Sequence, residues 1–218
     1  MRTITVKGVG TASTPPDLTV ISLHIAEKAR EYVDSVNGAN ERIEKLQKAI
    51  AAVGFAKEDL KTLSFNARTN YENYRDENGT YKQRFAGYAC EYYLKLSMDF
   101  DNKRLSETLE AIANSGANAE QSIEFTVKEP EKVSARLLKA ATENAREKAE
   151  VLCAASGVTL GELVNIDYNW RNITIHSASV YSEQFRGMDD GAPAAAMPEF
   201  EPDDIKSSDT ATFVWEIK

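Results

Sequence analysis

Alternating apolar and polar positions predict two β-strands at the start of the chain, over Thr3 to Ser13 and Leu18 to Ala29. After these strands the apolar spacing changes to three and four residues, which predicts an amphipathic helix. The apolar stripe of this helix comprises Val36, Ala39, Ile43, Leu46, Ile50 and Val53. Asp34 or Ser35 is expected to cap it, because either side chain can accept a hydrogen bond from a free backbone amide.

The chain after residue 60 predicts a long β-hairpin. Apolar residues alternate with mostly polar ones from Leu63 to Tyr71 and again from Ala86 to Met98. The polar tip contains Asn78-Gly79, a dipeptide that suits a tight turn with positive φ at both central residues. Strands of this length are expected to project from the body as a two-stranded arm.

Tyrosines concentrate on this predicted arm. The candidate residues for self-association are Tyr71, Tyr74, Tyr81, Tyr88 and Tyr92. One interpretation is that they form cross-strand packing pairs within the hairpin. The other is that they form an interface, since tyrosine offers a large contact area and a polar hydroxyl at low entropic cost. Both interpretations stay open.

The second half of the chain contains a similar order of elements. A short helix stops at Gly116, a strand covers Ile123 to Val127, and a long helix starts at Pro130, where the missing amide costs nothing. The stripe of this helix is rich in alanine, which lets it lie close against a neighbouring element. A strand around Val164 and a final strand over residues 212–217 follow.

The first helix ends at Gly54 and the long helix at Gly157, where a residue with positive φ closes a last turn. We therefore predict an α+β fold of duplicated strand–helix–strand–strand units, with mixed or antiparallel sheets covered by helices. The first repeat, 1–100, contains the hairpin. The second repeat, 101–218, contains a loop rich in glycine and proline over 182–203, which is expected to be mobile.

Charge and hydropathy narrow the choice of partners. The net charge of −8 disfavours nucleic-acid binding, which depends on basic residues. No apolar run approaches the roughly 18 residues of a transmembrane segment. The first seven residues alternate like a strand rather than forming a signal peptide. The sequence as written predicts a cytoplasmic protein, or a periplasmic or cell-envelope one if a leader was removed.

A search for reactive groups finds no catalytic constellation. Gly8-Val9-Gly10 resembles the start of a dinucleotide-binding fingerprint, but Ser13 replaces a required glycine and Pro15-Pro16 follows where a helix must begin. These glycines are better explained by a bulge or twist in an edge strand.

Histidines and cysteines likewise predict no site. His24 and His176 lack the spacing of metal ligands. Cys90 and Cys153 are expected to be buried small hydrophobic residues rather than a disulfide pair. We therefore expect no cofactor, no metal site, no catalytic residues and no enzymatic activity.

Five short motifs together resemble the SIMPL-domain family, also called domain of unknown function 541. They are Val6-x-Gly8-x-Gly10 leading to Pro16-Asp17, Gly87-Tyr88, Ser115-Gly116-Ala117-Asn118, Ala145-Arg146-Glu147-Lys148-Ala149, and Ala155-Ser156-Gly157-Val158 with Gly161. The resemblance covers nearly the whole chain. It implies an α+β fold and homo-oligomers, including a large ring-like particle in at least one relative.

Members of the family that this chain resembles have several different locations and roles. Some are periplasmic or outer-membrane-associated immunogenic proteins, others are linked to oxidative-stress tolerance, and a eukaryotic relative is an adaptor of a signalling kinase. The family offers no established catalytic residues. Three departures from the family are expected: the sequence as written carries no export leader, Val9 stands where relatives often have an acid, and Thr69 stands where a proline often precedes the tyrosines.

Two functional hypotheses follow. The first is a non-enzymatic scaffold or binding module that self-assembles through its arm, with itself as the main partner and any other protein partner unknown. The alternative is a carrier of a small molecule or lipid, with an apolar cleft between the repeats lined by Trp170 and Trp215.

Overall fold

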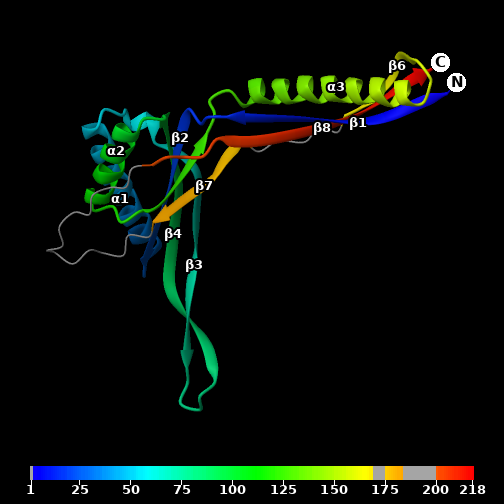
Figure 1. Ribbon diagram of the computed structural model, residues 1–218. Coiled ribbons are helices and arrows are strands. Elements are labelled where there is room, and N and C mark those ends of the chain that lie inside the picture. Colours follow the sequence, from blue (N-terminus) through cyan, green and yellow to red (C-terminus); the bar gives the residue numbers. More distant parts are fainter. Residues whose placement is uncertain (1, 169–174, 184–199) are drawn as a thin grey trace. The chain divides into compact units, whose positions relative to one another are not determined.

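The computed structural model describes residues 2–168, 175–183 and 200–218 (Figure 1). Contacts divide the chain into two compact units. Unit 1 comprises Met1–Asp17, Thr126–Ala178 and Pro202–Lys218, and unit 2 comprises Leu18–Phe125 and Ser179–Glu201. Each unit combines distant parts of the sequence. The repeats 1–100 and 101–218, and the duplication itself, stay a prediction.

The fold class is α+β, as predicted, with antiparallel sheets and helices. Unit 2 contains most of a five-stranded sheet with the strand order β3-β4-β2-β5-β7, of which Thr126 and the residues 176–178 belong to unit 1. Its strands are β2 (Leu18–Ala29), β3 (Lys61–Arg75), β4 (Tyr81–Asp99), β5 (Glu120–Thr126) and β7 (His176–Glu183). The predicted long hairpin is confirmed, because β4 pairs antiparallel with β3 as well as with β2.

Helix α1 (Tyr32–Ala52) packs on β2 and β4, and α2 (Asn102–Asn114) packs against α1. The short η1 (Lys57–Asp59) leads into β3. Most of the predicted apolar stripe of α1 is confirmed, and Leu46 and Ile50 are fully buried in the core of unit 2. The predicted cap is wrong, because α1 already begins after Glu31 and places Asp34 and Ser35 inside its first turn.

Unit 1 contains a three-stranded sheet with the order β1-β8-β6. Its strands are β1 (Thr3–Thr14), β8 (Ile205–Ile217) and β6 (Leu160–Asp167), and helix α3 (Pro130–Ala155) lies along β1 and β8. The first and last strands of the chain are antiparallel neighbours, from Thr3 opposite Glu216 to Thr14 opposite Ile205. This pairing joins the two ends of the sequence within unit 1.

The alanine-rich stripe of α3 faces the glycines of β1. Ala141 and Ala145 are fully buried, and a Cβ atom at Gly8 would lie only 2.0 Å from the carbonyl oxygen of Ala141. The sequence predicted a bulge or a twist in an edge strand here. Among the described residues β1 is an edge strand, but it has no bulge at Gly8 or Gly10, because its register with β8 runs without a shift. The glycines instead let the helix backbone approach the strand.

Both predicted glycine stops are confirmed. Gly54 and Gly157 have φ values of 86° and 69°. After each glycine the next amide donates back into the helix, from Phe55 to the carbonyl of Ile50 at 3.1 Å and from Val158 to that of Cys153 at 3.0 Å. This bond pattern satisfies carbonyls that a helix end would otherwise leave free.

Two sequence-based expectations fall wholly or largely outside the described residues. They concern Trp170 and the loop over 182–203, of which 184–199 are not described. Within the described part of the chain, every helix is too short or too polar to span a bilayer.

Candidate functional site

The hairpin extends beyond the rest of its sheet, as Figure 1 shows. Strand β2 ends at Ala29, which lies opposite Tyr88, so residues 70–87 pair only with one another among the described residues. We call residues 70–87 the arm. Strand β3 is also the last strand in the sheet order, and its outer edge therefore has no neighbouring strand in the described part of the chain.

A backbone bend at Gly87 marks the base of the arm. Gly87 has a φ of 122°, and a Cβ atom there would lie 2.2 Å from the carbonyl oxygen of Ala29. The register of β3 with β4 shifts beside it, between Asn70 and Tyr71. Such a bulge increases the local twist of a strand and changes the direction of the side chains that follow.

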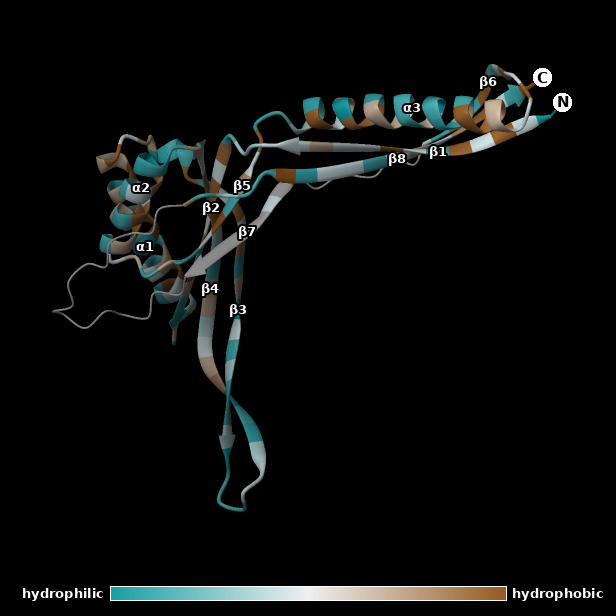
Figure 2. Cartoon of the chain, viewed as in Figure 1, coloured by the Kyte–Doolittle hydropathy of each residue, from teal (hydrophilic) through white to brown (hydrophobic). Residues whose placement is uncertain are grey.

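Asp76 stabilises the tip of the arm. Figure 2 shows that this tip is largely hydrophilic. The Asp76 carboxylate accepts hydrogen bonds from the amides of Asn78 at 3.0 Å and Thr80 at 2.9 Å. Only Gly79, with a φ of 78°, has positive φ here. The predicted turn with two positive φ values is therefore wrong, because Asp76 stabilises a wider loop in which Asn78 keeps negative φ.

Asp76 also binds Lys82, whose Nζ lies 2.8 Å from Oδ2. This ion pair and the backbone amide of Thr80 hold the pKa of Asp76 below its ordinary value. Nearby, Arg75 donates a hydrogen bond of 2.8 Å to the hydroxyl of Tyr81, and its guanidinium lies 4.6 Å from the centre of that ring.

The five candidate tyrosines occupy two different environments. Tyr71, Tyr74 and Tyr81 lie on the arm and are exposed, at 56, 38 and 69%. Tyr88 and Tyr92 lie closer to the body of the sheet and are half-buried. The structure thus separates three residues that can meet a partner from two that pack mainly within the chain.

Tyr92 illustrates the packing role. Its hydroxyl donates to Oδ1 of Asn40 on α1 at 3.1 Å, and its ring lies 4.8 Å from that of Phe65. Burial raises the pKa of Tyr92.

Sequence reasoning missed exposed phenylalanines beside the tyrosines. Phe65 and Phe85 are about half exposed. Phe85 lies edge-on to both Tyr71 and Tyr88, with centroid distances of 6.0 and 5.5 Å. The alternation along β3 places Phe65 and Tyr71 on one face, and this shared face is the signal that could have identified the larger aromatic surface.

Opposite charges line the other face of the hairpin. Arg68 on β3 donates to Glu91 on β4 at 2.7 Å, and Arg84 on β4 pairs with Glu72 on β3. The hydrogen bond from Arg68 holds the pKa of Glu91 below its ordinary value. Both faces of the hairpin thus carry groups that can contact another chain.

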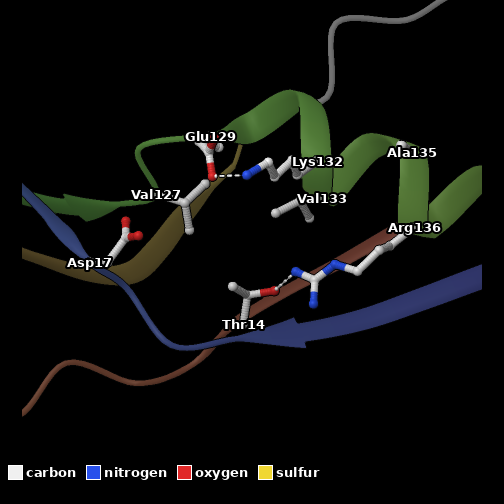
Figure 3. A pocket seen from close by; sticks show the side chains of 8 residues that line it. All are labelled: Thr14, Asp17, Val127, Glu129, Lys132, Val133, Ala135 and Arg136. Atoms are coloured by element: carbon white, nitrogen blue, oxygen red, sulfur yellow. Dashed lines mark hydrogen bonds and ion pairs between the residues drawn. The ribbon is translucent and has the colours of Figure 1, made fainter.

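A separate pocket lies in unit 1 beside the start of α3. Its volume is about 510 Å³, and its lining residues are Thr14, Asp17, Val127, Glu129, Lys132, Val133, Ala135 and Arg136 (Figure 3). Several of its charged groups already have partners. Lys132 pairs with Glu129 at 2.6 Å, Arg136 donates to Thr14 at 2.8 Å, and Asp17 accepts from the amide of Lys128.

The remaining candidate groups lie apart from one another. His24 stacks on Tyr93 and contacts Glu120, and Cys90 and Cys153 are free thiols, both buried. The described residues contain no cluster of three or more side chains suited to a metal ion. Trp215 stacks on Phe213 in the core of unit 1 and is 7% exposed, which leaves little of its ring for a ligand.

Two bacterial proteins are similar to this chain at low sequence identity. The 26 kDa periplasmic immunogenic protein of Brucella melitensis is 26% identical over 163 residues, which cover 75% of our chain and 65% of that protein. The matched region thus spans less than two thirds of the Brucella protein's length. The uncharacterized protein YggE of Escherichia coli K12 is 21% identical over 215 residues, covering 99% of our chain and 83% of YggE.

The similarity to one family extends over far more of the chain than any single motif. The profile of the SIMPL family, described as a protein of unknown function (DUF541), matches residues 4–215. This range includes both compact units and the arm. The chain belongs to the SIMPL family.

Proposed function

We propose that this protein is a non-enzymatic building block that associates with copies of itself through the hairpin of β3 and β4. The observation that carries the proposal is the exposure of large apolar side chains on a hairpin whose outer β3 edge has no neighbouring strand among the described residues. Leu63, Phe65, Tyr71 and Phe85 all lie exposed on this one hairpin.

A long edge strand that stays exposed to solvent tends to pair with another strand. A long exposed edge offers unpaired amides and carbonyls to any other strand. Exposed aromatic side chains add contact area that is typical of protein interfaces. A partner that pairs with the edge would satisfy the backbone groups and bury the aromatic groups together.

The test is the mass of the native protein by light scattering coupled to size exclusion. We expect a multiple of the 24.2 kDa chain mass at micromolar concentration. Replacing Tyr71 and Phe85 with serine should lower this mass. Val33→Ser is the matched control, because Val33 is also a large exposed apolar residue but lies on α1. A monomer in the unchanged protein contradicts the proposal.

We also propose that the protein acts in the periplasm or cell envelope. The support is that the Brucella relative is named as a periplasmic protein. Osmotic-shock fractionation of cells that express the protein from its own gene tests the location. Recovery with cytoplasmic markers alone would contradict it.

The carrier function remains the second candidate, and the pocket beside α3 is the observation that favours it. Lys132, Arg136, Glu129 and Asp17 suit a small polar ligand better than a lipid chain, because a lipid would leave these charges without water. Native mass spectrometry of freshly purified protein tests this function. A bound small molecule that is lost in Arg136→Ala would support it, and an unliganded protein would count against it.

A further inference from the structure

We propose that two copies of this chain pair through antiparallel contact of their β3 edges, with Asn70 of one copy opposite Asn70 of the other. This inference rests on the proposed self-association and adds the partner strand and its register. Phe65 through Arg75 would form the paired segment, and the two sheets would become one continuous sheet.

The edge itself supports strand pairing. Within the described residues, β3 bonds to β4 on one side and has no strand on the other. Its register with β4 shows an extra β3 residue between Thr62 and Ser64, but the shift beside Asn70 places the extra residue in β4. The part of β3 from Phe65 to Arg75 is therefore free of inserted residues and can pair regularly with another strand.

Symmetry limits the possible registers. Two identical antiparallel strands in one sheet are related by a two-fold axis perpendicular to that sheet. Such an axis leaves every side chain on its own face, so opposed residues must both have even numbers or both have odd numbers. Glu72 is the only acidic residue in the paired segment, and Arg68 and Arg75 are the only basic residues in it.

Charge then selects one register. Arg75 lies on the opposite face from Glu72, so only Arg68 can oppose Glu72 across the axis. This pairing requires Asn70 at the centre and occurs twice, once on each side of the axis. Registers centred on Arg68 or Glu72 would instead place like charges directly opposite each other, which destabilises a strand pair.

The pairing also extends charge alternation across the joined sheet. Within one chain, Arg84 binds Glu72 and Arg68 binds Glu91. In the proposed pair, a row of alternating charges would cross the joined sheet. It would run from Arg84 to Glu72 of one copy and continue with Arg68 and Glu91 of the second copy. Guanidinium groups have several donors and carboxylates several acceptor positions, so each inner residue can serve both neighbours.

Cysteine cross-linking of the full chain tests the register. Asn70→Cys should form a disulfide-linked dimer under mild oxidation, because opposed residues have Cα atoms about 4.5–5.5 Å apart, within the range of a disulfide. Asn66→Cys is the matched control. It replaces the same residue type on the same face of β3, but the proposed pair separates its two copies by about 27 Å, at about 3.4 Å per residue.

A charge exchange supplies a second test that does not depend on oxidation. Arg68→Glu and Glu72→Arg should each raise the Kd of self-association about tenfold, since each places like charges at both symmetric positions. An equimolar mixture of the two variants should associate again, because every opposed pair then has opposite charges. Changes within each chain are the same before and after mixing, so they cannot produce this recovery.

The outcomes separate this inference from the proposed function. An oligomer that cross-links through Asn66→Cys rather than Asn70→Cys, or whose charge variants fail to recover on mixing, overturns the β3 register and leaves self-association standing. A protein that is monomeric before any substitution overturns both. Cross-linking at Asn70 together with recovery on mixing supports both.

Discussion

Gly10 on β1 lies directly against the carbonyl group of Leu137 on α3. A Cβ atom built at Gly10 would stand 1.9 Å from that oxygen, and the oxygen belongs to the helix backbone. Because backbone cannot rotate away as a flexible side chain can, the strand and the helix keep this distance only with glycine. The neighbouring contact of Gly8 with Ala141 repeats the arrangement one turn along the helix.

We expect Gly10→Ala to lower the free energy of unfolding by about 2–3 kcal/mol, since the added methyl group must separate α3 from β1. Thr11→Ala is the matched control, because Thr11 is exposed on the other face of the same strand, and it should change stability by less than about 0.5 kcal/mol. Urea denaturation followed by circular dichroism measures both. Equal effects of the two substitutions would refute the close approach.

Arg42 provides a second test, within unit 2. Its guanidinium donates to the carbonyl oxygens of Ala26 and Ala117 at 2.6 Å and of Asn118 at 2.5 Å. It also pairs with Glu27 at 3.0 Å, and its side chain is only 18% exposed. One side chain therefore connects α1 to β2 and to the loop after α2.

Arg42→Met should cost about 2–3 kcal/mol of stability, because it keeps the aliphatic packing but leaves three carbonyl groups without their donor. Lys45→Met tests the same change in side-chain type at an exposed position of the same helix and should be nearly neutral. Denaturation curves compare the two. A loss below about 0.5 kcal/mol for Arg42→Met would show that water replaces the guanidinium without penalty.

Local patterns predicted most elements of the fold. The strand over Leu18 to Ala29, the start of α3 at Pro130 and the glycine stops all depend on nearby residues, and all were confirmed. The pairing of β1 with β8 was not predicted, because the two strands lie at opposite ends of the sequence and no local signal relates them. For the same reason, the sequence did not predict that each compact unit combines distant parts of the chain.

The candidate site was predicted in part. Alternation identified the hairpin and its tyrosines, but it could not say that Tyr88 and Tyr92 are half-buried, since that depends on the end of β2 and on Asn40 of α1. The cross-strand ion pairs were also missed. Their partners, Arg68 with Glu91 and Arg84 with Glu72, depend on a register that shifts at the base of the arm.

Acid should loosen the tip of the arm. Folding lowers the pKa of Asp76 through Lys82 and the amide of Thr80, so its charged form stabilises the tip. That stabilisation is complete above the ordinary pKa of 3.8 and is lost as pH falls through the lower folded-state value. The amide shifts of Asn78 and Thr80, followed by NMR, should titrate together with a midpoint below 3.8.

Asp76→Asn is the control for this titration, because it keeps the shape of the side chain and removes its charge. Both amides should then show no transition in the same pH range. A midpoint at or above 3.8 in the unchanged protein would mean that Lys82 and the backbone amides do not favour the charged carboxylate.

The thiol of Cys90 should be unreactive in the folded protein. Cys90 is fully buried within the core of unit 2, and burial raises its pKa, with a smaller contribution from the negative charges of Glu27 and Glu91. Cys153 is also buried, on α3. A thiolate is the reactive form of cysteine, so a raised pKa and exclusion of water act in the same direction.

At pH 7.5 we therefore expect modification by an aromatic disulfide reagent to be at least about a hundredfold slower than in denaturant, where both thiols should react at the rate of free cysteine. Cys153→Ser isolates the signal of Cys90. If Cys90 reacted rapidly in native buffer, strand β4 would have to open at Ala89–Glu91 without global unfolding. The paired edges of β2 and β3 on either side of β4 oppose such an opening, because both ladders would have to break together.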